Sequence, residues 1–168
     1  MKNSGLFNSP FEVGLRSLLV LFEARPMLAD TQKLVFLDYA LVHSGDFAGG
    51  PQSLHPSTPA RSSEFLSRRA VIESGLLLML SRGLLDVRLG EGGVFYAASD
   101  DANAFVDNLG SEYFLSMRER AKWVAKSLGD FDTTVLAKRF GEQAVRWGSE
   151  FLFMRDLSDD LSNVWKAS

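Results

Sequence analysis

The chain has 168 residues, of which 46% are hydrophobic and 23% are charged, and it contains no cysteine. This size is typical of one globular domain with a core of its own, and the lack of cysteine excludes disulfides, thiol nucleophiles and cysteine-held metal sites. The net charge of −3 gives no general attraction to nucleic acid, because phosphate contacts require a basic excess.

The beginning of the sequence differs from a secretory signal, because Met1 to Gly5 are followed at once by a capped amphipathic segment. Apolar runs such as Leu76 to Leu80 are far shorter than the roughly 20 residues needed to cross a bilayer. We therefore expect a cytoplasmic protein without a membrane partner.

The first half of the sequence predicts three helices. Ser9, with Glu12 three residues later, is a signal for a helix start, and the apolar residues that follow cover most of the helix circumference, which indicates a buried helix. Asp30 can cap a second helix that ends near Gly45. A third helix is predicted over residues 62–81 from its apolar period.

Residues 44–63, between the second and third helices, are rich in glycine and proline and have no apolar period. Structureless connections of this length are uncommon inside compact domains. We therefore predict an ordered loop that serves as an interaction element. Asp46, His55, Arg61 and Glu64 are the polar groups expected to bond this loop to the domain or to face a partner.

Two short alternating runs, 84–89 and 94–97, flank a glycine-rich turn and predict a β-hairpin. Three helices followed by a hairpin form the pattern of a winged helix-turn-helix, a motif best known for DNA binding. Residues 1–98 contain nine basic and nine acidic side chains. The pattern thus occurs here without the basic excess of a DNA-binding module.

The rest of the sequence is expected to be helical, with helices over 100–109, 111–128 and 132–147. The predicted fold is therefore mainly α. We expect a winged helix-turn-helix-like N-terminal unit, three helices plus a β-hairpin, over residues 1–98. A C-terminal helical extension over residues 99–168 is expected to pack on it in a single compact domain.

A catalytic or metal site in this chain would have to use its two histidines, His43 and His55. Asp38 and Asp46 are the neighbouring carboxylates that could join them around a divalent ion. Asp38 and His43 are five residues apart, which differs from the i, i+4 pair of a helical zinc site. We expect these groups to organise the loop by hydrogen bonds. The sequence also has no phosphate-binding loop and no serine nucleophile elbow. It predicts no catalytic, cofactor-binding or metal-binding residue, and no enzymatic activity.

Arg61, Arg68 and Arg69 lie just before and within the third predicted helix, which a winged helix uses to contact DNA. They can contact phosphates or a protein partner. Because residues 1–98 carry no net charge, we favour ion pairs with Glu64, Glu73 or carboxylates elsewhere over phosphate contacts.

Two large apolar residues, Phe153 and Met154, fall off the apolar stripe of the last predicted helix. Large apolar side chains outside a core are candidates for an interface. The predicted partner-binding set is Asp46, His55, Arg61, Glu64, Arg68, Arg69, Phe153 and Met154.

Several short stretches, taken in order along the chain, together resemble a known family. They are Phe7–Glu12, Leu37–Tyr39, His43–Asp46, Ser53–Pro56, Arg61-Ser62 with Glu64, Leu80–Leu84, and Arg118–Ala121 with Trp123. Over roughly residues 6 to 155 the chain resembles the middle component of bacterial ABC three-component systems. That family includes the small C subunit of Lamassu-type defence against phages and plasmids.

The resemblance implies a small subunit without catalytic residues that sits with an SMC-like or Rad50-like ATPase and an effector, commonly a nuclease. It implies contact with DNA only through the complex. Two functions therefore stand after the sequence analysis. One is a non-catalytic adaptor that binds the ATPase and helps couple it to the nuclease, and the alternative is a winged-helix DNA-binding transcription regulator.

Overall fold

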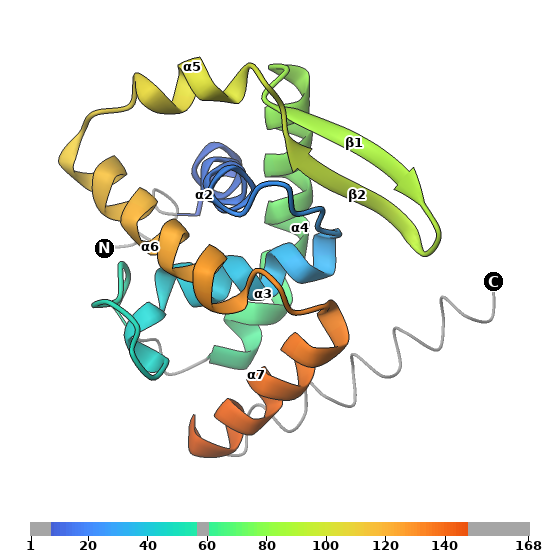
Figure 1. Cartoon of the computed structure of the whole chain (residues 1–168). Coiled ribbons are helices and arrows are strands. Elements are labelled where there is room, and N and C mark those ends of the chain that lie inside the picture. Colours follow the sequence, from blue (N-terminus) through green and yellow to red (C-terminus); the bar gives the residue numbers. More distant parts are fainter. Residues whose placement is uncertain (1–7, 57–60, 148–168) are drawn as a thin grey trace.

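The computed structural model describes residues 8–56 and 61–147, with side chains for 8–56 and 67–142. Within these residues the fold is mainly helical and contains a two-stranded antiparallel sheet, as the sequence predicted (Figure 1). In the same part of the chain, no helix combines the length and the apolar character needed to cross a bilayer.

The first described helix, α2 (Pro10–Glu23), is the central element of the core. It begins where the sequence predicted, because the Ser9 hydroxyl accepts a hydrogen bond from the Glu12 N–H at 3.3 Å. Residues 12–21 of α2 are all buried. The long helix α4 (Arg61–Ser81) packs along one side of α2, and further helices cover its other sides (Figure 1).

Two glycines allow the backbones of α2 and α4 to touch. A Cβ atom on Gly75 of α4 would lie 2.6 Å from the Gly14 nitrogen and 2.7 Å from the Pro10 carbonyl oxygen of α2. A glycine inside a helix costs about 1 kcal/mol relative to alanine. Gly75 therefore lowers the helix propensity of α4 but allows a close crossing with α2.

The second predicted helix is α3 (Thr31–Val42). The Asp30 carboxylate accepts a hydrogen bond from the Lys33 N–H at 2.7 Å, so the predicted cap is confirmed. From Lys33 to its last residue the helix is buried, because α4 packs on one side of it and the C-terminal helices pack on others.

The segment after α3 is ordered, as predicted, over its described part. A short 3₁₀ turn, η1 (Ser44–Asp46), is followed by chain that folds back on the end of α3. The N–H groups of Leu54 and His55 both donate to the Val42 carbonyl oxygen, at 3.0 and 3.1 Å. Residues 57–60 lie outside the described part of the chain.

The C-terminal helices are α5 (Ala102–Asp107), α6 (Glu112–Leu128) and α7 (Thr133–Trp147). α6 packs on α2 and α3, and α7 packs on α3. The predicted apolar stripe of α7 is confirmed at Leu136 and Phe140, which are both buried. The proposed division of the chain at residue 98 stays a prediction.

The helical period, followed back from Met117, Ala121 and Val124, predicts Tyr113 on the core side of α6. This prediction is wrong, because Tyr113 is 40% exposed and its neighbour Phe114 is buried. The N–H of Phe114 donates to the Ser111 hydroxyl at the start of α6. Tyr113 lies at the edge of the core instead, where its hydroxyl group reaches Glu12 of α2 at 2.6 Å.

The hairpin consists of β1 (Leu85–Gly90) and β2 (Gly93–Ala98), joined by a tight turn. It follows α4 directly and projects away from the helices (Figure 1). Between α2 and α3, Ala29 pairs with Tyr96 of β2 through two backbone hydrogen bonds, of 3.1 and 2.8 Å. The base of the hairpin is therefore tied to the segment that joins the first two helices.

Candidate functional site

Asp38 is the centre of a buried charge cluster made by α2, α3 and α4. Its carboxylate accepts hydrogen bonds from Arg16 Nε at 2.5 Å, from Arg16 Nη2 at 3.1 Å and from Arg68 Nη1. All three side chains are almost fully buried. Burial alone would raise the pKa of the Asp38 carboxyl, but the two arginines outweigh burial and lower this pKa to about 2. Asp38 is therefore ionised and joins three helices through charged hydrogen bonds.

A second layer of polar groups extends the cluster to α6 and to the loop after α3. Glu12 Oε1 lies 3.5 Å from Arg16 Nη1 and accepts a hydrogen bond from the Tyr113 hydroxyl at 2.6 Å. His55 Nε2 lies 3.4 Å from the same hydroxyl and 3.8 Å from Glu12 Oε1. Asn8 Oδ1 accepts a further hydrogen bond from Arg16 at 3.3 Å.

The protonation of this second layer follows from its burial. Burial raises the pKa of the Glu12 carboxyl, although the Tyr113 hydrogen bond opposes this shift. Burial, together with the hydrogen bond to Glu12, raises the pKa of the Tyr113 hydroxyl. Burial, and then the positive charge of Arg16, lowers the pKa of His55 to about 4. At neutral pH His55 is thus a neutral hydrogen-bonding group.

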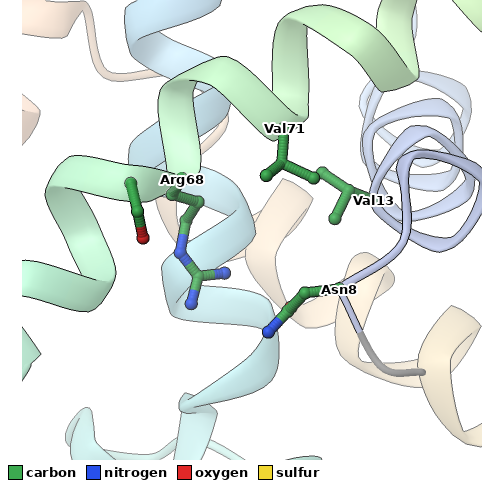
Figure 2. A pocket seen from close by; sticks show the side chains of 5 residues that line it. Asn8, Val13, Arg68 and Val71 are labelled. Carbon is green, nitrogen blue, oxygen red and sulfur yellow. The ribbon is translucent and has the colours of Figure 1, made fainter. Parts of the chain in front are cut away.

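A small cavity lies beside the cluster. Figure 2 shows Arg68 of α4 and Asn8, just before α2, on one side of it, with Val13 and Val71 on the other. Its volume of about 50 Å³ gives room for a water molecule or two. Ligand pockets usually measure roughly 300 to 1,000 Å³, so this cavity has the size of a hydration site.

The loop after α3 is held by backbone as well as side-chain groups. Arg120 of α6 donates from Nε to the Gln52 carbonyl oxygen at 2.8 Å, and Ser44 Oγ donates to the same oxygen at 3.3 Å. The Phe47 ring lies 6.1 Å from the Trp123 ring, measured between centroids, and contributes an apolar contact. α6 therefore fixes the shape of this loop.

Two of the predicted partner-binding arginines have structural contacts. Arg68 is buried against Asp38, in the ion pair that sequence analysis had favoured. Arg69 pairs with Glu73 one helical turn later at 3.1 Å and also donates to Gln32 of α3 at 3.1 Å. The partner-binding role of both residues stays a prediction.

Two more of the predicted partner-binding residues lie on the loop after α3. His55 belongs to the second layer of the cluster, whereas Asp46 lies half-buried on η1. Arg61 and Glu64 fall in the first turn of α4, where side chains lie outside the described part of the chain. Phe153 and Met154 also lie outside the described residues.

The residues considered as metal ligands include two that have other structural contacts. Asp38 is bound to two arginines, and His43 packs its ring on Tyr39 at a centroid distance of 4.7 Å. Over residues 8–56 and 61–147, no three or more histidine, aspartate or glutamate side chains are grouped so that they could hold a metal ion.

Arg16 and Tyr113 belong to the cluster but were not among the residues predicted from the sequence. A signal for Arg16 existed, since one arginine inside an otherwise apolar, buried helix requires a buried counter-charge. Asp38 in α3 carries the same signal, and the two signals together would have suggested the pair. No comparable signal identified Tyr113, because its role depends on the position of α6 against α2.

Comparison with curated proteins and with solved structures gave no significant match. The sequence model of one family, described as "ABC-three component (ABC-3C) system Middle Component 2", matches residues 6–150. This match covers every helix and strand named above, and it confirms the resemblance found in the sequence. The chain therefore belongs to the Middle Component 2 family of ABC three-component systems.

Proposed function

We propose that the chain is a non-catalytic adaptor subunit. In this proposal it binds an SMC-like or Rad50-like ATPase and helps couple it to an effector nuclease in bacterial defence of the Lamassu type. Membership in a three-component family implies that the chain works with partner components. The two classes of partner, and a cytoplasmic location, are part of the proposal.

A winged-helix arrangement of the N-terminal unit is also part of the proposal. The order α2, α3, α4, β1, β2 supports it, and so does the pairing of Ala29, between the first two helices, with Tyr96 of β2. In a DNA-binding winged helix, the counterpart of α4 enters the major groove and the hairpin forms the wing. The chemical character of the surface of α4 and the hairpin therefore indicates which kind of partner is bound.

The charge and apolar character of that surface is the observation that carries the adaptor proposal. From residue 69 to the end of the hairpin the charges balance, because Arg69, Arg82 and Arg88 are matched by Glu73, Asp86 and Glu91. Two large apolar side chains are strongly exposed there, Leu77 at 67% and Leu89 at 83%. A DNA-contacting surface needs a basic excess, whereas exposed apolar side chains favour a protein partner.

The charge cluster supports the non-catalytic part of the proposal. The charge of Asp38 is compensated by two buried arginines, and the Glu12 carboxylate accepts a hydrogen bond from the Tyr113 hydroxyl. These contacts join helices and leave a cavity of only about 50 Å³ beside them. We expect the isolated chain to hydrolyse neither ATP nor nucleic acid.

A surface variant tests the adaptor proposal. Leu77→Asp changes an exposed side chain of α4, so the melting temperature should stay within a few degrees. We expect capture of the ATPase subunit by the tagged chain to weaken at least roughly tenfold, about 1.4 kcal/mol. The matched control is Leu115→Asp on α6, which is 53% exposed and should bind normally. Unchanged capture by both variants would contradict the role of α4.

The alternative function, a DNA-binding transcription regulator, is favoured by the helix and hairpin order alone. It predicts that the isolated chain shifts duplex DNA at nanomolar concentration in a sequence-dependent way. The adaptor proposal predicts duplex binding weaker than about micromolar at physiological salt.

A further inference from the structure

The strand β1 is the open edge of the hairpin. On β2, Tyr96 exchanges both of its backbone hydrogen bonds with Ala29, so its N–H and C=O groups point away from β1. Val87 lies directly opposite Tyr96 in the ladder. Because the two residues of such a pair both direct their backbone groups outward, the N–H and C=O of Val87 face the open edge. By the same alternation, those of Leu89 do so too, and those of Leu85 point in the same direction at the buried base of the strand.

The two faces of β1 differ in chemistry. Val87 and Leu89 place exposed apolar side chains on one face, and Asp86 and Arg88 place exposed charges on the other. Opposite these charges, β2 offers Ala97 and Phe95, which carry no charge. Within the described part of the chain, Asp86 and Arg88 form no ion pair.

We propose that β1 pairs antiparallel with β1 of a second copy of the chain, about a two-fold axis at Val87. In this register Val87 lies opposite Val87 of the second copy, and Leu85 lies opposite Leu89 of the second copy. Each residue of β1 with outward backbone groups therefore lies opposite another such residue. Asp86 faces Arg88 of the second copy, and Arg88 faces Asp86. The strand is thus self-complementary in backbone groups, in charge and in its apolar face.

Neighbouring registers lack this complementarity. A two-fold axis at Asp86 would place two aspartates directly opposite each other, and an axis at Arg88 would place two arginines opposite each other. Like charges directly opposite in a sheet are destabilising. Outward backbone groups would meet in these registers as well, Leu85 with Val87 or Val87 with Leu89, so the like charges are what disfavours them. The proposed pairing makes one four-stranded sheet and covers an edge that would otherwise be open to association.

The test of this inference is separate from that of the adaptor proposal, because it concerns only copies of the same chain and leaves Leu77 of α4 unchanged. Sedimentation equilibrium of the full chain should give a concentration-dependent dimer. Arg88→Asp and Asp86→Arg should each weaken that dimer at least roughly tenfold, since two-fold symmetry turns two attractive pairs into two repulsive ones. The double variant D86R/R88D should restore it, because the charges again face opposite charges.

Mixing the two single variants gives a sharper result. The Arg88→Asp strand is acidic at both positions and the Asp86→Arg strand is basic at both, so each should fail to pair with itself and should pair with the other.

Hydrogen exchange gives a second readout. The amides of Val87 and Leu89 should become protected as concentration rises, whereas the Arg88 amide is protected throughout. A wild-type chain that stays monomeric, or single variants that do not associate when mixed, would overturn the proposal. Protection of Val87 only when the ATPase subunit is added would assign this edge to a heterologous strand instead.

Discussion

Among single residues, Asp38 is the one whose charge should matter most for stability. Asp38→Asn leaves Arg16 and Arg68 buried without their shared counter-charge, and breaking a buried pair costs about 3 to 5 kcal/mol. We expect a loss of this size in the free energy of unfolding, measured in urea. The matched control is Asp101→Asn, an exposed position that makes no capping hydrogen bond, with a change below about 0.5 kcal/mol. Equal losses would contradict the role of the cluster.

His55 should make stability depend on pH in the mildly acidic range. Its pKa is lowered from 6.5 to about 4 in the folded chain, by burial first and by Arg16 second. The unfolded chain therefore takes up a proton that the folded chain resists, so stability is full above pH 6.5 and is lost as the pH falls towards about 4. Since one pKa unit corresponds to about 1.4 kcal/mol, the loss is on the order of 2 to 3 kcal/mol.

A His55→Gln variant separates this contribution from that of its neighbours. Glu12 acts in the opposite direction, because its raised pKa means that protonation favours the folded state. Asp38 contributes only at lower pH, since its pKa of about 2 means that its stabilisation is lost below its ordinary range. Urea titrations from about pH 7 to about pH 4 should show a smaller loss of stability in the variant. Identical pH dependence in both proteins would rule out His55 as the cause.

At the scale of elements, the crossing of α2 and α4 should be sensitive to one methyl group. Gly75→Ala places a Cβ atom 2.6 Å from the Gly14 nitrogen, so the helices must separate, at a cost of about 1 to 3 kcal/mol. Gly141→Ala in α7 is the matched control, because that Cβ meets no atom within 4 Å and alanine gains helix propensity of up to about 1 kcal/mol. Thermal melts should move in opposite directions, and stabilisation by both changes would contradict the close crossing.

The helices and strands were largely predictable from the sequence because their signals are local. The caps at Ser9 and Asp30 and the glycine-rich turn of the hairpin act over a few residues. The partners of the charged residues have no such local signal, because Arg16 and Asp38 meet only after two separate helices have packed. The one hint at this pair was that each residue lies in an otherwise apolar, buried helix. For Arg68 the kind of contact, an ion pair, was predicted and its partner was not. At the start of a helix, periodicity alone does not predict whether a side chain is buried, because burial there depends on how far the core extends. Tyr113 is exposed for this reason.

At the scale of the whole molecule, the buried polar groups have structural contacts, and the proposed partner surface lies on α4 and the hairpin. The charge cluster and its second layer join α2, α3, α4, α6 and the loop after α3. The surface of α4 and the hairpin carries balanced charge and exposed apolar side chains. This division agrees with the proposed role as a non-catalytic adaptor.

The most direct test of the adaptor proposal compares two affinities of the isolated chain at physiological salt. One is its affinity for the ATPase subunit, and the other is its affinity for duplex DNA. Both can be measured by immobilising the chain and titrating each partner. We expect saturable binding of the ATPase and duplex binding weaker than about micromolar, with no sequence preference. Nanomolar, sequence-dependent binding of DNA together with no binding of the ATPase would contradict the proposal.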